Sequence, residues 1–323
     1  MPTNDDCPRC GAAVSPRGWG RVCPACLLEF GLRGYPDETG SSPPSELPPP
    51  PSRIGGYQQL DRIGAGGMGV VYRALQISLD RVVALKLLRE ELSLDPQQVH
   101  RFRSEAETAA KLNHPNIVAI YEVGTHAGRP YFAMEYIEGR NLAELVKENP
   151  FSPIRAARLL QTVARAVHHA HECGILHRDL KPSNVMLDPH DEPRVLDFGL
   201  AKHTAPVPEA TLPGAIVGSP GYMPPEQAMG RPTDARADVY SLGAVLYELL
   251  TGRAPFRADT PLETLRLVRE EEPAPPRLLL PRIPRDLETI CLHCLAKDPR
   301  DRYPPARALA EDLGRFLARD PIL

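Results

Sequence analysis

Aromatic residues are scarce in this chain of 323 residues, where they account for 6% of the sequence and include a single tryptophan. No run of about 18 apolar residues occurs, and the N-terminus lacks the charged-then-apolar pattern of a secretory signal, so neither a membrane span nor export is expected. The net charge is only −3, which argues against a general attraction for nucleic acid. We therefore expect a cytoplasmic protein, whose 42% hydrophobic content is sufficient for a core.

Four cysteines near the N-terminus form two C-x-x-C pairs, Cys7 with Cys10 and Cys23 with Cys26. Paired turns of this kind hold a tetrahedral Zn²⁺, because each turn directs two thiolates toward one ion. Two disulfides or unpaired thiols are the alternatives, and disulfides are disfavoured in a reducing cytosol. Residues 1–34 therefore resemble a zinc ribbon with a structural Zn²⁺, in which no coordination position is left open for catalysis.

Proline is abundant, at 37 residues, and many of these cluster before residue 57. The runs Ser41-Ser42-Pro43-Pro44 and Pro48-Pro49-Pro50-Pro51 are typical of a semi-rigid spacer. We assign residues 35–56 to a proline-rich linker. It leads into a main domain at residues 57–318, and a short tail follows at residues 319–323.

One stretch of the main domain, His177–Asn184, concentrates polar side chains that suit catalysis. It contains Asp179, Lys181 and Asn184, and the triplet Asp197-Phe198-Gly199 begins thirteen residues after Asn184. An acid to accept a hydroxyl proton, a cation for a phosphoryl oxygen and two oxygen ligands for a hard metal together suit phosphoryl transfer. A chance cluster of polar loop residues is the alternative, and the order and spacing of the motifs make it remote.

A glycine-rich stretch, Gly64–Val71, fits the pattern G-x-G-x-x-G-x-V and continues as a strand. A dinucleotide-binding fold would need a helix directly after the glycines. A glycine hairpin can instead place backbone N–H groups over phosphates without side-chain clashes. Lys86 follows inside the apolar run Val82–Leu88, where a lysine is unfavourable to bury unless it is paired.

A helix is predicted from Pro96 to about Asn113, because Asp95 and Pro96 form a typical N-cap and first-turn pair. Glu105 lies in the apolar stripe of this helix, whereas Glu107 points away from it. An acid on a buried face needs a cation, so we expect Glu105 to pair with Lys86.

In this order and context the motifs resemble the protein kinase family over about residues 57–318, and bacterial serine/threonine kinases of the eukaryotic-like type in particular. The resemblance implies an α+β fold with a small β-rich lobe at residues 57–137 and a large α-rich lobe at residues 138–318. It also implies transfer of the ATP γ-phosphoryl group to protein serine or threonine hydroxyls, with Mg²⁺ or Mn²⁺ as the cofactor.

The resemblance implies a role for each motif residue. Asp179 would accept the hydroxyl proton and Lys181 would steady the γ-phosphate, while Mg²⁺ would be held by Asn184 and Asp197. Met134 would be the gatekeeper of the adenine site. The residues implied to contact ATP are Ile63, Gly64, Ala65, Gly66, Gly67, Met68, Gly69, Val70, Val71, Ala84, Lys86, Glu105, Met134, Glu135, Ile137 and Met186.

Regulation by phosphorylation is also implied. Arg178 would pair with a phosphate added to the loop at residues 200–219, where Thr204 and Thr211 are the candidate acceptors. The protein substrates and the chain itself, through autophosphorylation, are the expected partners, and nucleic acid is not.

Two structural contacts complete the implied site. Glu226 is expected to form a buried ion pair with Arg302. Asp238 is expected to cap the helix Val239–Leu250, to hold the catalytic-loop backbone, or to do both.

A catalytically silent kinase-fold scaffold with a zinc-ribbon docking module is the alternative function. Proteins of that class usually lose the lysine, the aspartate or a metal ligand. Lys86, Asp179, Asn184 and Asp197 are all present here, which favours an enzyme.

Overall fold

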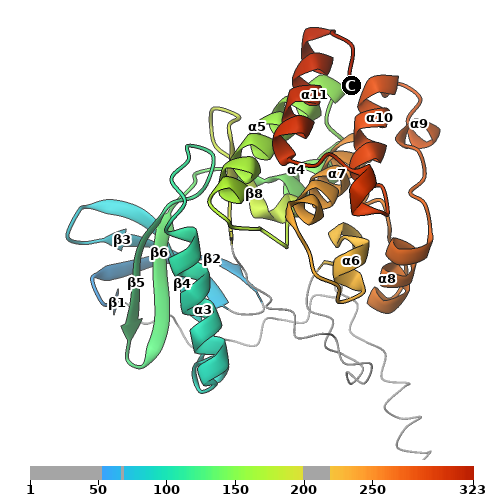
Figure 1. Cartoon of the computed structure of the whole chain (residues 1–323). Helices are drawn as coiled ribbons and strands as arrows, with labels where there is room; N and C mark the ends of the chain where they lie inside the picture. The colour runs from blue at the N-terminus through green and yellow to red at the C-terminus, as the bar shows by residue number, and fades with distance from the viewer. Residues whose placement is uncertain (1–52, 67–68, 199–218) are drawn as a thin grey trace, which may run out of the picture. The chain divides into compact units, whose positions relative to one another are not determined.

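The computed structural model describes residues 53–66, 69–198 and 219–323, which all belong to one compact unit, Pro51–Leu323. The first part of this unit is a six-stranded antiparallel sheet with helix α3 packed on it, and the remainder is mainly helical (Figure 1). The predicted combination of a β-rich and an α-rich part is therefore present.

The large sheet has the strand order β1-β2-β3-β4-β6-β5. Its strands are β1 (Arg53–Ile54), β2 (Tyr57–Ala65), β3 (Gly69–Gln76), β4 (Arg81–Leu88), β5 (Ile120–His126) and β6 (Arg129–Glu135). Strand β1 lies in the segment that the sequence assigned to the linker. It pairs with β2 and buries Ile54 completely, so the ordered domain begins before Tyr57.

The central strand β4 explains how a lysine can point inward. Its side chains alternate between two faces of the sheet, and Val83, Leu85 and Leu87 pack into the cluster on the face away from α3. Ala84 and Leu88 pack on the opposite face, in the cluster that also contains residues of α3 (Pro96–Ala109). Lys86 lies between them and shares this second face.

Helix α3 ends at Ala109, four residues earlier than predicted, and Asp95 caps it by accepting a hydrogen bond from the Gln97 N–H. The largely apolar run Ile117–Val123 predicts the next strand, but β5 begins only at Ile120. The strand starts late because the backbone of the preceding residues is hydrogen-bonded elsewhere. The Val118 N–H donates to the Val195 carbonyl at 2.9 Å, so this segment bonds to the other part of the domain before it joins the sheet.

The helical part surrounds α5 and α7. Its helices are α4 (Leu142–Glu148), α5 (Pro153–Glu172), α6 (Pro225–Ala228), α7 (Ala235–Thr251), α8 (Pro261–Glu270), α9 (Pro276–Leu279), α10 (Arg285–Cys294) and α11 (Ala306–Ala318), and α2 (Glu90–Ser93) precedes α3. A small sheet, β7 (Arg140–Asn141), β8 (Val185–Leu187) and β9 (Pro193–Val195), lies beside them. Among the described residues, no helix is long and apolar enough to cross a bilayer.

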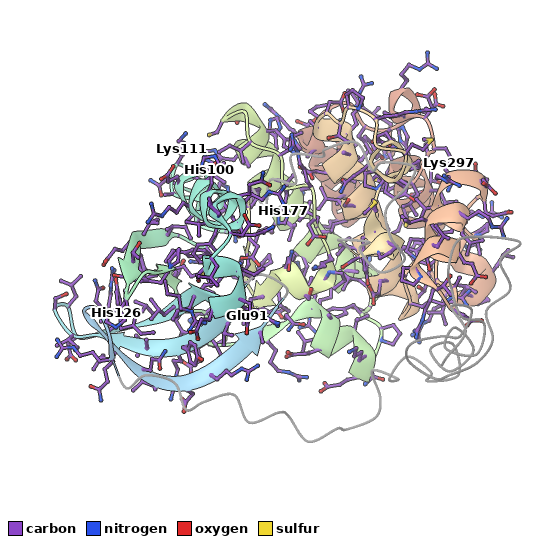
Figure 2. All side chains as sticks on the ribbon, turned by 90° about the horizontal axis from the view of Figure 1, so that it is seen from below. Glu91, His100, Lys111, His126, His177 and Lys297 are labelled. Atoms are coloured by element: carbon purple, nitrogen blue, oxygen red, sulfur yellow. The ribbon has the colours of Figure 1, made fainter. Side chains whose placement is uncertain are left out.

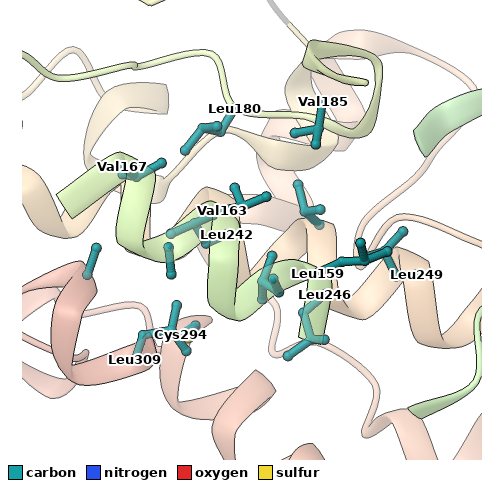
Figure 3. Close-up of a cluster of buried hydrophobic side chains, with 14 of the residues drawn as sticks. Leu159, Val163, Val167, Leu180, Val185, Leu242, Leu246, Leu249, Cys294 and Leu309 are labelled. Atoms are coloured by element: carbon teal, nitrogen blue, oxygen red, sulfur yellow. The ribbon is translucent and has the colours of Figure 1, made fainter. Parts of the chain in front are cut away.

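Apolar side chains of α5 and α7 interdigitate in the main core, where Val163 lies close to Leu242 (Figure 3). Full burial of each such side chain contributes roughly 1.5–3 kcal/mol. Cys291 and Cys294 of α10 are fully buried in this core, where they pack as apolar side chains.

Helix α7 begins at Ala235, four residues before the predicted start at Val239. Asp234 is its N-cap and accepts a hydrogen bond from the Arg236 N–H. The prediction that Asp238 caps this helix is therefore wrong, because Asp238 lies inside the first turn and is fully buried.

Candidate active site

Lys86 is the centre of a buried charge cluster. Its Nζ lies 3.3 Å from Glu105 Oε1 and 3.1 Å from Asp197 Oδ1. These three residues come from β4, α3 and the segment after β9, so one ammonium joins both parts of the domain. The predicted Lys86–Glu105 pair is confirmed.

The cluster shifts the acidity of its members. Burial alone would lower the pKa of Lys86, but the charges of Asp197 and Glu105 outweigh it and raise that pKa. Burial raises the pKa of Glu105 to about 7, and Lys86 offsets only part of this effect. Burial also opposes the charged form of Asp197, yet the ammonium of Lys86 holds the pKa of Asp197 below its ordinary value.

The glycine-rich turn joins β2 to β3. The Gly66 N–H donates to the Gly69 carbonyl at 2.8 Å, which closes the turn. A Cβ atom at Gly69 would lie 2.5 Å from the Leu87 carbonyl oxygen, so only glycine fits beside β4. Gly67 and Met68 fall outside the described residues.

Residues assigned to the adenine site come from several strands. Ala84 and Met134 face each other across β4 and β6, and both pack in the cluster under α3, as does Val71 of β3. Met186 lies on β8 in the small sheet. A small cavity behind Met134 is lined by Glu105, Phe132, Val195, Asp197 and Phe198, among others.

The stretch His177–Asn184 forms a loop with three polar contacts. Lys181 Nζ lies 2.9 Å from Asp179 Oδ2 and donates to Ser219 Oγ at 3.2 Å. Asn184 Nδ2 donates to the Asp179 carbonyl at 2.9 Å, which leaves the amide oxygen of Asn184 available as a ligand.

Asp238 holds this loop from below. Its carboxylate accepts hydrogen bonds from the backbone N–H groups of His177 and Arg178, both at 2.8 Å, so the predicted support of the catalytic loop is confirmed. Its third partner is His171 Nε2, also at 2.8 Å. Burial would raise the pKa of Asp238, but the hydrogen bond and charge of His171 and the contacts with His177 hold it below its ordinary value.

The sequence did not identify His171 as a functional residue. Its partner, Asp238, is 67 residues away in the chain, and no local pattern connects the two.

His177 links the catalytic loop to the segment that contains Asp197, and it lies where the strand-bearing and helical parts meet (Figure 2). Its Nδ1 accepts a hydrogen bond from the Asp179 N–H, so its Nε2–H donates to the Leu196 carbonyl at 2.9 Å. Its ring lies 4.7 Å from the ring of Phe198, centroid to centroid. Arg178 and Asp197 have φ values of 64° and 56°, a left-handed conformation that is unusual for side chains of this kind and is often found at functional sites.

Glu226 and Arg302 form the expected buried ion pair. Arg302 donates to the two carboxylate oxygens of Glu226 at 2.8 and 2.9 Å, and its side chain is completely buried. Its three remaining N–H groups donate to the carbonyls of Ala296, Arg236 and Lys297, which braces the segment before α11.

Several predicted site residues lie outside the described part of the chain, namely Cys7, Cys10, Cys23, Cys26, Thr204 and Thr211. Within the described ranges no group of three or more histidine, cysteine or acidic side chains is arranged for metal binding.

Comparison with known proteins identifies the class. A model of the protein kinase domain matches residues 57–313, and the chain belongs to this family. Its fold is the two-lobed protein-kinase fold, as predicted.

The relatives are bacterial serine/threonine kinases. PknB of Mycobacterium leprae (strain TN) is 42% identical over 277 residues, which cover 84% of this chain and 44% of that protein. PknB of Mycobacterium tuberculosis (strain ATCC 25618 / H37Rv) is 42% identical over 278 residues, with the same shares. The crystal structure of the Mycobacterium tuberculosis PknI kinase domain matches with a TM-score of 0.64 and 27% identity over 81% of this chain and 96% of that chain. The chain thus spans less than half the length of these PknB relatives.

Proposed function

We propose that the chain is a serine/threonine protein kinase that transfers the γ-phosphoryl group of ATP to protein hydroxyls. The observation that carries this proposal is the position of Lys86, whose ammonium contacts Glu105 and Asp197 at once. A phosphate-binding cation held by one acid next to a second, metal-binding acid is the arrangement that phosphoryl transfer by kinases requires.

Nucleotide binding would use both parts of the domain. The backbone of Gly64–Gly69 would cover the phosphates, and Lys86, oriented by Glu105, would bind their oxygens. The adenine ring would lie between Val71 and Ala84 on one side and Met186 on the other. The backbone of the hinge at Glu135 and Ile137 would bind its polar edge, and Met134 would limit the depth of the site.

The metal would be Mg²⁺ or Mn²⁺. The donor set fits such a hard cation, because Asp197 offers a carboxylate with a lowered pKa and Asn184 offers an amide oxygen. When bound, the ion neutralises charge on the phosphate oxygens.

The acceptor hydroxyl would be oriented by Asp179, whose carboxylate would also take its proton. Lys181 lies within reach of both Asp179 and Ser219, so it could steady the transferred phosphoryl group while it holds the substrate-binding segment in place. Catalysis would come mainly from positioning and charge stabilisation.

We further propose two features outside the described residues. Phosphorylation of Thr204 or Thr211, by the chain itself or by another kinase, would give Arg178 a phosphate partner and activate the enzyme. Residues 1–34 would form a zinc ribbon around one structural Zn²⁺. Metal analysis of the whole chain and of Cys7→Ser would test the ribbon, with one zinc per chain expected only in the unchanged protein.

A silent scaffold is the less favoured function, because it would not need the polar contacts of Lys86, Asp179 and Asn184 to be kept. We place the reaction in the cytoplasm, where ATP is available and cysteine thiolates stay reduced.

The proposal is tested by incubating the chain with radiolabelled ATP, Mg²⁺ and a general protein substrate. We expect label on the substrate with the unchanged protein and a loss of at least about 100-fold with Asp179→Asn, because the positioned base is removed. Equal incorporation by both proteins would refute the assignment of Asp179.

A further inference from the structure

An ion pair that the sequence did not indicate links Glu135 to Arg194. A terminal nitrogen of the Arg194 guanidinium contacts Glu135 Oε1, and the two side chains are 20% and 26% exposed. The partners are 59 residues apart in the chain. We call this pair the hinge latch.

The two residues of the hinge latch lie on opposite sides of the proposed adenine site. Glu135 is the last residue of β6, directly before the hinge segment. Arg194 lies in β9, where its Cα is paired with that of Met186 of β8. The pair therefore joins the hinge to the small sheet that carries Met186, the residue assigned to the opposite face of the adenine.

Backbone contacts run beside the hinge latch and close a ring. The Glu135 N–H donates to the Ala119 carbonyl at 2.9 Å, and the Val118 N–H of the same segment donates to the Val195 carbonyl at 2.9 Å. The segment at Val118 and Ala119 is therefore held between the end of β6 and β9. The ion pair of Arg194 with Glu135 links β9 directly to the end of β6. It therefore constrains the distance between these two strands more tightly than the backbone hydrogen bonds through Val118 and Ala119 do.

We propose that Arg194 is a positioning residue for nucleotide binding, which sets the distance between the hinge and Met186 through its ion pair with the Glu135 side chain. This inference rests on the proposed function, because it assumes that the adenine of ATP lies at the hinge. Because the pair is partly buried, water and salt screen it less than an exposed ion pair, whose contribution is usually small. The expected deficit is in nucleotide affinity, since Arg194 does not contact Asp179.

The experiment measures the binding of ATP, adenosine and tripolyphosphate, each with Mg²⁺, by calorimetry on the full chain. The variants are Arg194→Met, Glu135→Gln, the double variant and the conservative Arg194→Lys. Arg155→Met is the matched control, because Arg155 forms an exposed ion pair with Asp191 that involves no hinge residue. The binding stoichiometry reports the folded fraction of every variant.

We expect the Kd of ATP and that of adenosine to rise about five- to twentyfold in each single neutral variant, while tripolyphosphate binding changes by less than about twofold. The double variant should bind no more than about twofold worse than the singles, because both lose the same interaction. Arg194→Lys should recover most of the affinity, and the KM for ATP should rise by a larger factor than kcat falls.

Single variants that bind ATP as tightly as the unchanged protein would overturn the inference, as would losses that multiply in the double variant or an equal loss in Arg155→Met. If Arg194→Met does not fold, the ATP affinities of Glu135→Gln and Arg194→Lys still test the inference. An unchanged protein that binds no ATP would instead refute the proposed function, so the two failures can be told apart.

Discussion

The hydrogen bonds of Asp238 give the sharpest prediction about the catalytic loop. This fully buried carboxylate accepts bonds from the backbone N–H groups of His177 and Arg178 and from His171. In Asp238→Asn one oxygen becomes an NH₂ group that faces a donor, so at least one bond is lost and the charge disappears. A buried hydrogen bond to a charged group contributes about 1.5–3 kcal/mol, so we expect the free energy of unfolding to fall by about 2–5 kcal/mol.

The same change should reduce activity, because the loop positions Asp179. A displacement of about 1 Å can cost about 100-fold in rate, so we expect kcat to fall at least about tenfold. Urea denaturation followed by fluorescence measures the stability, and radiolabel transfer measures kcat.

Asp234→Ala is the matched control in the same helix turn. It removes the N-cap bond to the Arg236 N–H and should lower stability by about 0.5–2 kcal/mol, with kcat within about twofold of the unchanged protein. The reasoning is refuted if Asp238→Asn keeps its kcat or loses no more activity than Asp234→Ala.

The pH dependence of stability follows from the same residue. The folded pKa of Asp238 lies below its unfolded value, so its stabilising contribution is complete above the unfolded pKa, near 3.8. This contribution is lost as the pH falls through the lower, folded pKa. Asp238→Asn should therefore show a shallower loss of stability on acidification below that value than the unchanged protein.

Three further predictions concern other parts of the site. Lys86→Met should lower kcat/KM by at least about 100-fold in steady-state assays, because it removes the ammonium proposed to bind phosphate, and unchanged kinetics would contradict this role. It should also lower stability, because Glu105 and Asp197 lose their shared cation. Arg302→Met should lower the free energy of unfolding by about 3–5 kcal/mol in urea titrations, since it leaves Glu226 as an uncompensated buried charge. The double variant with Glu226→Gln should recover part of this loss. Gly69→Ala should raise the KM for ATP by about tenfold or more, because the added Cβ would push β3 away from the Leu87 carbonyl. A KM equal to that of the unchanged protein would show that the turn accommodates the methyl group.

Contacts that follow from local periodicity were predicted correctly. The pairing of Lys86 with Glu105 rests on two short-range patterns, the alternation of a buried strand and the apolar stripe of a helix. Each pattern alone determines which face a side chain occupies. Once the two faces pack together, a single acid and a single base on them must meet.

Element ends were predicted less well, because they depend on partners distant in the chain. The strand expected from Ile117 starts at Ile120, since the preceding residues bond to Val195. Likewise, Asp238 looked like a cap in a sequence where Asp234 is an equally good cap. Only the position of the catalytic loop above α7 decides between them.

The sequence by itself determined the class of the protein and the chemical groups of its site, because motif residues and their spacing are written along the chain. Tertiary structure alone decided that Asp234 rather than Asp238 caps α7, that His171 completes the hydrogen bonds of Asp238, and that Arg194 reaches Glu135. The last two of these contacts join residues 67 and 59 positions apart through buried or half-buried polar pairs. Such pairs leave no periodic trace in the sequence, because each depends on which distant segments the fold brings together, where the two partners offset each other's loss of water.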